Sequence, residues 1–300
     1  MNVAPSSTVS GQEHRYTHDA SWGALPAGWT EWGFVPSVVV DSQDRVYVHH
    51  RAPRPVVVYS RTGELLSMWG DQFEKGAHGL HLRQEADGEY LYFTDVARHC
   101  VVKCTLDGRE LWTLGSPGQV GAAEEPFNRP TDIAFTPQGD FYVSDGYGNS
   151  RVHHYDPDRK LIRSWGEPGS GPGQFKLVHD VWFDTRGASP GAPGRLWVCD
   201  RENYRIQIFT PAGEFIEEKT GFQRPNGMWV DSQGYMYVAE LLNRVTILDP
   251  QDRVVGHIGG RPSREPGELL KPHAIWGDSH GDLYIAEVED GARIQKFVRS

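Results

Sequence analysis

The chain repeats itself, and the length of the repeat limits the folds that it can adopt. Six segments share one apolar pattern and follow one another at intervals of roughly 40 to 50 residues. They read VPSVVVD from Val35, AHGLHLR from Ala77, RPTDIAF from Arg129, LVHDVWFD from Leu177, RPNGMWVD from Arg224 and KPHAIWGD from Lys271. Repeats of this length are single supersecondary units, which bury their apolar faces by packing against their neighbours.

Each copy carries the pattern of four short strands. The first run is followed by a second, such as YLYFTD, DFYVSD and DLYIAE, and by a third, such as RVHHYD and RIQIFT. A fourth run often ends at glycine, as in LLSMWG and LIRSWG, and turns such as RTGE and PQGD separate the runs. Short runs rich in Val, Ile, Tyr, Phe and Trp between such turns are typical of β-hairpins. Six copies of four strands predict an all-β fold, a six-bladed β-propeller that resembles the NHL-repeat type.

The two ends of the chain are expected to complete one blade. The last copy runs out after its third strand, at Phe297–Ser300, whereas RYTHDASWG at residues 15–23 ends with the Trp-Gly pair of the fourth strands. We therefore expect an N-terminal strand to close the last blade and to leave no open sheet edge. Residues 15–300 are predicted to form a single propeller domain, preceded by a flexible polar leader at residues 1–14.

One column through the first runs carries histidine in alternate copies. The even copies have histidine and the odd copies have small polar residues, in the order Ser37, His78, Thr131, His179, Asn226, His273. In a ring of six units the even members lie about 120° apart and face the axis. Three neutral imidazoles without a cysteine favour zinc, and a fourth coordination position left open favours catalysis. We therefore predict that His78, His179 and His273 bind one catalytic zinc ion.

A second column, at the end of the second run, is acidic in five copies and basic in the first. It reads His50, Asp95, Asp145, Asp200, Glu240, Glu287. We expect the carboxylates to bind turn amides or a nearby arginine and so to maintain the repeat. The first copy departs from this rule with His49, His50 and Arg51. Because a guanidinium binds a carboxylate through two hydrogen bonds, Arg51 is a candidate for substrate binding.

The third copy has a longer turn after its second strand. Its SDGYGNSR is one residue longer than CDRENYR in the fourth copy, and the insertion falls around Tyr147. A tyrosine at this place can act as a general base or as a hydrogen-bond donor. The residues alone leave open the alternative that Tyr147 is an aromatic residue packed on a loop.

Several segments resemble one enzyme family. TDVARHCVVK from Thr94, SDGYGNSRV from Ser144, GQFKLVHDV from Gly173, CDRENYRIQIF from Cys199 and KPHAIWGDSHGDLYIAE from Lys271 resemble the peptidyl-α-hydroxyglycine α-amidating lyases. The likeness covers most of residues 35–300. It implies a six-bladed propeller in which the three column histidines bind a catalytic zinc ion. It also implies that Arg51 lies near the reacting group and that Tyr147 is catalytic, and Arg201 in the DREN motif is a further candidate for substrate binding.

The sequence departs from the family pattern at two positions. The family has an aspartate directly after the third zinc histidine, linked to catalysis and to a structural calcium ion, and here that residue is Ala274. Asp132 and Asp180 occupy the equivalent place in two other copies and are candidates to compensate. Gly148 stands where the extracellular members carry a cysteine. Calcium binding and the exact reaction therefore stay open.

The activity that the resemblance implies is a carbon–nitrogen lyase reaction. It splits a carbinolamide, R–CO–NH–CH(OH)–COO⁻, into an amide and glyoxylate, so the expected partner is a small-molecule or peptide-like substrate with a carboxylate. Three alternatives stay open. The first is a zinc enzyme of shifted chemistry, such as a ureidoglycolate-like lyase, a hydrolase or a dehydratase. The others are a non-catalytic NHL binding module and a calcium-dependent lactonase-like hydrolase, which would require carboxylates in place of the column histidines.

Composition excludes other classes of partner. The formal net charge of −10 argues against nucleic acid, which requires a clustered basic surface. No apolar run approaches the length of a membrane-spanning helix, so no membrane partner is expected. Three cysteines are too few for a disulfide framework, and the expected compartment is the cytoplasm. The oligomeric state is not predicted.

Overall fold

A computed structural model describes residues 14–121, 127–186 and 193–300. The expected flexible leader lies outside these residues apart from its last member, His14. That side chain is 4% exposed, and its ring lies 4.1 Å from the ring of Tyr235. The described part of the chain contains no helix long and apolar enough to cross a membrane.

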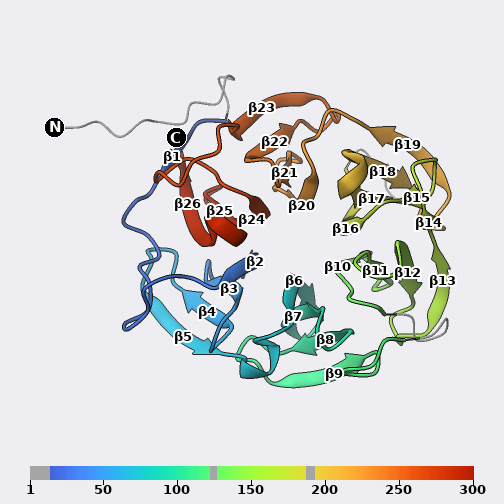
Figure 1. The fold of residues 1–300 in the computed structure, drawn as a ribbon, viewed down its shortest axis with the longest axis horizontal. Helices are drawn as coiled ribbons and strands as arrows, with labels where there is room; N and C mark the ends of the chain where they lie inside the picture. The colour runs from blue at the N-terminus through green and yellow to red at the C-terminus, as the bar shows by residue number, and fades with distance from the viewer. Residues whose placement is uncertain (1–13, 122–126, 187–192) are drawn as a thin grey trace. The chain divides into compact units, whose positions relative to one another are not determined.

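Almost all regular structure in the described residues belongs to six antiparallel sheets of four strands, which we call blades one to six in chain order (Figure 1). Blades one to three comprise β2 (Phe34–Val40), β3 (Val46–Arg51), β4 (Val56–Tyr59), β5 (Leu65–Trp69); β6 (Ala77–Glu85), β7 (Gly88–Asp95), β8 (Cys100–Cys104), β9 (Glu110–Leu114); and β10 (Asp132–Phe135), β11 (Phe141–Asp145), β12 (Arg151–Tyr155), β13 (Leu161–Trp165).

Blades four to six comprise β16 (Val178–Asp184), β17 (Arg195–Asp200), β18 (Arg205–Phe209), β19 (Phe215–Lys219); β20 (Pro225–Val230), β21 (Met236–Glu240), β22 (Arg244–Leu248), β23 (Val254–Gly259); and β24 (Pro272–Gly277), β25 (Leu283–Glu287), β26 (Arg293–Arg299), β1 (Tyr16–His18). The smaller elements are the parallel pair β14 (Glu167–Pro168) and β15 (Gln174–Phe175), and the 3₁₀ turns η1 (Asp71–Phe73), η2 (Arg201–Asn203) and η3 (Glu289–Gly291).

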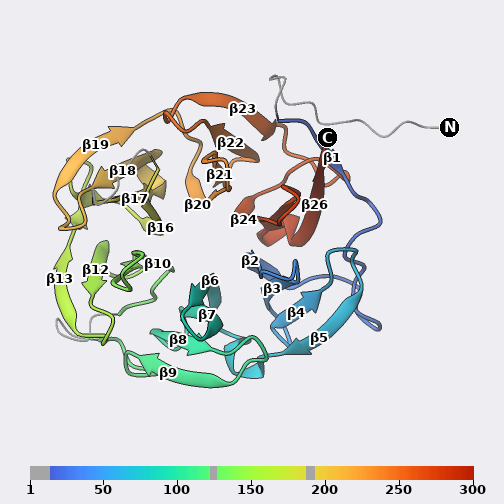
Figure 2. The same ribbon diagram turned by 180° about the vertical axis from the view of Figure 1, so that it is seen from behind.

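The fold is the predicted all-β, six-bladed β-propeller, and the N-terminal strand closes the last blade as expected. Strand β1 pairs antiparallel with β26, with Tyr16 opposite Arg299 and His18 opposite Phe297. Both views show β1 beside β26 at the outer edge of blade six (Figures 1 and 2). Contacts divide the chain into two compact units, Lys75–Gly227 and the segments on either side of it. The prediction of a single domain over residues 15–300 is not tested by this division.

In the unit that contains both chain ends, one core joins blade one to blade six. Trp22, from the Trp-Gly pair that follows β1, is 6% exposed, and its ring lies 5.4 Å from Tyr59 of blade one and 4.9 Å from Tyr284 of blade six. Its indole N–H donates a hydrogen bond to the carbonyl of Ser60 at 3.3 Å. A large ring packed on two blades at once holds the first and last blades together.

In the unit Lys75–Gly227, burial differs between the inner and outer strands of a blade. All five residues of β11 are buried, whereas the outer strand β13 is mostly exposed or half-buried. Ile133 and Phe141 of blade three pack with Tyr92 and Val101 of blade two in one apolar cluster. An inner strand that is covered on both faces needs a nearly continuous apolar run, which explains the sequence pattern.

The acidic column maintains the repeat as predicted. Its five carboxylates are buried and accept hydrogen bonds from turn amides or from arginine, threonine, asparagine and glutamine side chains: Asp95, Asp145, Asp200, Glu240 and Glu287. Asp200 accepts from the backbone N–H of Lys176 and from Nε of Arg205, each at 2.9 Å. Such hydrogen bonds hold the turn in place. If the turn moved away, the buried carboxylate would lose a partner without gaining water, which costs free energy.

Closure of the last blade can be tested at Trp22. We expect Trp22→Ala to lower the free energy of unfolding by about 3–5 kcal/mol, because it empties a site between two blades. Urea denaturation followed by circular dichroism measures this change. Leu66→Ala, at a residue of β5 that is 46% exposed, serves as the control and should cost under about 1 kcal/mol. Equal effects of the two substitutions would contradict the closing role of Trp22.

Candidate metal and catalytic site

His78 and His179 occupy the same place in their blades. Each is the second residue of an innermost strand, β6 or β16, and both are buried. Each lies in a register irregularity, between Ala77 and Leu80 in one strand and between Val178 and Val181 in the other. A β-bulge bends its strand and redirects the side chain at that point. The repeated sequence therefore gives the two imidazoles the same local backbone.

Backbone carbonyls of the next blade set the tautomer of both histidines. Nδ1 of His78 lies 2.7 Å from the carbonyl oxygen of Thr131, and Nδ1 of His179 lies 2.8 Å from that of Asn226. A carbonyl oxygen only accepts, so Nδ1 carries the hydrogen and Nε2 keeps its lone pair. This arrangement is typical of metal-binding histidines, whose second nitrogen is oriented by a carbonyl or a carboxylate. Thr131 and Asn226 are themselves members of the column, a role that sequence reasoning missed.

The two Nε2 atoms converge on one hydroxyl group. The Oη atom of Tyr147 lies 3.0 Å from Nε2 of His78 and 3.2 Å from Nε2 of His179, and the two imidazole centroids are 5.0 Å apart. A phenol has one hydrogen and can donate it to only one of these lone pairs at a time. Two acceptors aimed at one point are what a bound cation requires. The structure thus brings Tyr147 together with two of the three predicted metal ligands.

Two glycines permit this close approach. A Cβ atom on Gly146 would lie 1.6 Å from the carbonyl oxygen of Val178, so only glycine lets the turn before Tyr147 reach the strand that carries His179. A Cβ on Gly79, directly after His78, would lie 2.5 Å from the carbonyl oxygen of Thr131, the atom that accepts from His78. Both positions need glycine because backbone passes where a side chain would be.

Two arginines flank the ring of Tyr147. The guanidinium carbon of Arg129 lies 5.2 Å from the ring centroid, and that of Arg201 lies 5.8 Å from it. Arg201, a predicted substrate residue, also donates from Nε to Glu202 at 2.9 Å and from Nη1 to Asn226 at 3.3 Å. Sequence reasoning missed Arg129, although it stands in the RPTD segment that begins the third copy. Both guanidinium groups lie within cation–π distance of the ring and help to hold it in place.

The third column histidine lies in the other unit and repeats the same local geometry. His273 is the second residue of β24, at a register irregularity between Pro272 and Ala274. Its Nδ1 lies 2.6 Å from the carbonyl oxygen of Pro36, so its Nε2 also keeps the lone pair. His78, His179 and His273 are therefore three buried imidazoles that could hold a metal ion.

Arg51 and His273 both lie against the ring of Phe34 in this unit. Arg51 ends β3 and pairs with Phe34 of β2, and its guanidinium carbon lies 4.4 Å from the Phe34 ring centroid. The Phe34 ring lies 5.9 Å from the ring of His273. The residue predicted to bind the substrate carboxylate and one of the predicted metal ligands thus contact the same aromatic ring.

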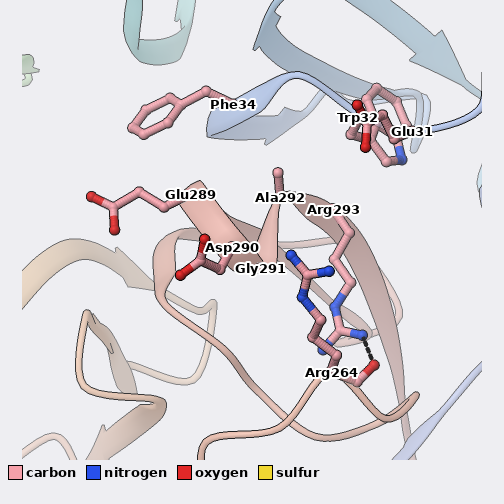
Figure 3. Close-up of a pocket in the computed structure, with 9 residues that line it drawn as sticks. All are labelled: Glu31, Trp32, Phe34, Arg264, Glu289, Asp290, Gly291, Ala292 and Arg293. Atoms are coloured by element: carbon pink, nitrogen blue, oxygen red, sulfur yellow. Dashed lines mark hydrogen bonds between the residues drawn. The ribbon is translucent and has the colours of Figure 1, made fainter.

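A cavity of about 390 Å³ opens beside Phe34. Figure 3 shows the Phe34 ring on one side, Trp32 and Glu31 on another, and Ala292 with its methyl group between them. The remaining lining carries charge of both signs: Arg264, Glu289, Asp290 and Arg293. The cavity offers space for the rest of a bound molecule beside Phe34, whose ring packs against Arg51 and His273.

Comparisons with known proteins fit this fold. Residues 127–155 match the NHL repeat family. NHL repeat-containing protein 3 of Homo sapiens is 30% identical over 261 residues, which are 81% of this chain and 72% of that protein. The chain belongs to the NHL-repeat family.

The resemblance of this NHL-repeat protein to amidating lyases is confirmed. Peptidyl-alpha-hydroxyglycine alpha-amidating lyase 1 of Drosophila melanogaster is 29% identical over 224 residues, 65% of this chain and 40% of that protein. Peptidyl-glycine alpha-amidating monooxygenase B of Xenopus laevis is 37% identical over 170 residues, 54% of this chain and 18% of that protein. The NHL-repeat chain thus spans less than half the length of that lyase and about a fifth of the length of that monooxygenase.

Solved structures share the fold at low identity. A virginiamycin B lyase from Staphylococcus aureus with quinupristin matches at a TM-score of 0.58 and 17% identity, over 95% of this chain and 89% of that one. A gluconolactonase from Xanthomonas campestris matches at a TM-score of 0.63 and 14% identity, over 100% and 99% of the two chains. At these identities the likeness concerns the architecture alone.

The position after each column histidine differs among the blades of this NHL-repeat protein. Ala274 packs against the apolar core that joins blades one and six. Asp132 and Asp180, the candidates to compensate for it, are hydrogen-bonded to each other, and burial raises the pKa of Asp132. Their carboxyl groups therefore share a proton more readily than two exposed carboxylates would.

The histidines beside Arg51 have a structural environment. Nε2 of His50 donates to the carbonyl of Arg54 at 3.1 Å, and its ring lies 4.9 Å from Trp29 and 5.2 Å from Trp32. Burial lowers the pKa of His50 to about 4 and that of His49 well below its usual value. Of the unusual trio in the first blade, Arg51 is the residue that packs on Phe34, the ring that also lies against His273.

The depressed pKa of His50 predicts a pH dependence of stability. Between about pH 6.5 and pH 4 the unfolded chain binds a proton at His50 that the fold does not. The stability from neutral His50 is therefore complete above about pH 6.5 and is lost as the pH falls toward 4, by about 3 kcal/mol at most.

Urea denaturation at pH 7 and pH 4.5 tests this expectation. His50→Gln should show a smaller fall in unfolding free energy than the parent protein over this interval. His280→Gln, at a side chain that is 58% exposed, should behave like the parent. An unchanged slope in His50→Gln would contradict the assignment.

Proposed function

We propose that this protein is a zinc-dependent carbon–nitrogen lyase that cleaves an α-hydroxyglycine-type carbinolamide to an amide and glyoxylate. The observation that carries the proposal is the convergence of two carbonyl-oriented imidazoles on the hydroxyl of Tyr147. The similarity to proteins named amidating lyases supports it. The three column histidines have the same tautomer, and none of the predicted ligands is a thiolate or carboxylate.

His273 would complete the metal site with His78 and His179. The three stand at one position in alternate blades of a six-bladed propeller, and each Nδ1 is held by a backbone carbonyl. Three imidazole nitrogens fit zinc, and they leave room for a substrate atom in the fourth position. Zinc bound there would polarise the substrate hydroxyl and make its proton easier to remove.

The protein's own groups would then carry the proton and hold the substrate. Arg51 would bind the carboxylate through its guanidinium. Tyr147, which lies between Arg129 and Arg201, would act as the general base and take the proton from the hydroxyl. The oxygen lone pair then forms the C=O bond of glyoxylate, and the C–N bond breaks with its electrons going to nitrogen. The proton held by Tyr147 returns to that nitrogen and gives the amide, so atoms and charge balance.

The substrate environment follows from the same residues. The acyl part of the carbinolamide would lie in the cavity beside Phe34, whose ring packs against Arg51. A small-molecule or peptide-like carboxylate is thus the proposed partner, with Arg201 as a second substrate-binding residue. We also propose the cytoplasm as the compartment, and the three buried cysteines, which are all free, are consistent with it.

A second candidate function keeps the zinc site and changes the reaction. Ala274, in place of the family aspartate, favours a shifted activity: a ureidoglycolate-like lyase, a hydrolase or a dehydratase. The metal content is the same in both cases. Identification of the products formed from a hydroxyglycine substrate and from ureidoglycolate separates them.

Metal content is the first test of the proposed site. We expect elemental mass spectrometry to find about one zinc ion per chain in the purified protein. His179→Ala should lose most of it, because two imidazoles bind zinc far more weakly than three. His280→Ala is the matched control and should keep the metal. Absence of zinc from the parent protein even after zinc is supplied would exclude the catalytic proposal and favour a non-catalytic binding module.

The two catalytic roles make a separate prediction. Arg51→Ala and Tyr147→Phe should each lower kcat/KM for glyoxylate release by about 100-fold or more while the zinc content stays unchanged. Arg54→Ala, three residues after Arg51 and exposed, is the control and should keep full activity. A variant at Arg51 or Tyr147 with parental turnover would remove that residue from the mechanism.

A further inference from the structure

A second cavity, of about 520 Å³, lies in the unit Lys75–Gly227, away from the histidines. Its lining includes the turn around Gln138 and Gly139, which precedes β11, whereas Tyr147 follows the end of β11. Five residues of extended strand separate two points by about 17 Å. The cavity therefore lies at the opposite end of blade three from Tyr147, and its volume is within the range of small-molecule sites.

The floor of this cavity is aromatic. Tyr92 lies 4.5 Å from Phe135 and 5.7 Å from Trp112 between ring centroids, and Phe135 lies 5.7 Å from Phe141. Tyr92 and Phe141 are buried, whereas Trp112 and Phe135 are half-buried and contribute to the cavity surface. A flat ring that enters the cavity can stack on these side chains.

The rim carries excess positive charge. Arg83 places its guanidinium carbon 4.6 Å from the Phe135 ring centroid, and Arg159 places its own 5.2 Å from that of Trp112. Arg83 shares a hydrogen bond with the hydroxyl of Tyr92, and neither arginine forms an ion pair with a carboxylate in the part of the chain that the structure describes. The carboxylate of Glu85, also in the lining, is already bound by Lys103 at 2.8 Å and by the hydroxyl of Tyr92.

The geometry points to a binding site for a small aromatic anion, a flat ring that bears a carboxylate. A guanidinium stacked on an aromatic face is held in a fixed plane and keeps its N–H edge available for two hydrogen bonds to an oxyanion. Two such groups above an aromatic floor recognise the charge and the ring at once. The chain has a net charge of −10, so two arginines without acidic partners create a local positive potential that attracts an anion to this cavity. The site is independent of the proposed lyase activity.

Binding of 2-naphthoate, followed by isothermal titration calorimetry, tests the inference. We expect 2-naphthoate to bind at least about tenfold more tightly than 2-naphthylmethanol, which has the same ring without the charge. Arg83→Gln and Arg159→Gln should each raise the Kd for naphthoate about tenfold. Arg151→Gln removes the same charge at the other end of blade three, where Arg151 begins β12, and should leave the Kd unchanged.

Three results would overturn the inference: no binding of naphthoate at millimolar concentration, equal binding of the acid and the alcohol, or an unchanged Kd in both arginine variants. Arg159 is exposed, so its variant is informative even if Arg83→Gln lowers the melting temperature. Zinc content should be the same in all these variants. A failure of the lyase proposal would therefore leave this test unaffected.

Discussion

The structure depends on one requirement: the inner strands of the blades are largely buried, so both faces of each blade must be covered. A four-stranded sheet cannot cover its own faces, so each blade needs neighbours, and the first and last blades need each other. Trp22 meets that need between blades one and six, where it packs on Tyr59 and Tyr284. As a consequence, one position of the repeat occupies the same place in the innermost strand of each blade. A residue type that recurs at that position therefore recurs at equivalent places in the structure.

The two columns use this regularity in different ways. The carboxylates of the acidic column accept hydrogen bonds from groups of their own blade, as Asp200 does from Lys176 and Arg205. The histidines of the other column use only Nδ1 to bind the protein, by donating to a backbone carbonyl of the next blade. Their Nε2 atoms keep a lone pair that can bind a ligand. A carbonyl is present whatever the side chain, so the odd copies can vary their column residue and still orient the histidine. That is why Thr131 and Asn226 can differ from each other and still orient His78 and His179, while the carbonyl of Pro36, next to Ser37, orients His273.

The sequence was sufficient to predict the features that repeat. These features are the four strands of each copy, the N-terminal strand that completes the last blade, and the structural role of the five acidic-column residues. A pattern that occurs several times can be recognised even where one copy is weak. Arg129 beside Tyr147 and the glycine at position 146 could not be predicted in this way. They depend on how closely one turn approaches a strand of the next blade. That approach is possible because Gly146 has no Cβ atom, which would clash with the carbonyl oxygen of Val178.

The same division explains how the chemistry of such a protein can change while its fold does not. Ala274 replaces a charged residue expected from the family, yet its side chain simply joins the apolar core of blades one and six. The carbonyl of Pro36 still orients His273 beside it, because that contact involves no side chain from position 274. Solved propellers at 14–17% identity keep the same architecture. Under the proposed function, the reaction would therefore depend on the few side chains that the backbone holds in place, Arg51 and Tyr147 foremost, because the propeller itself is compatible with many activities.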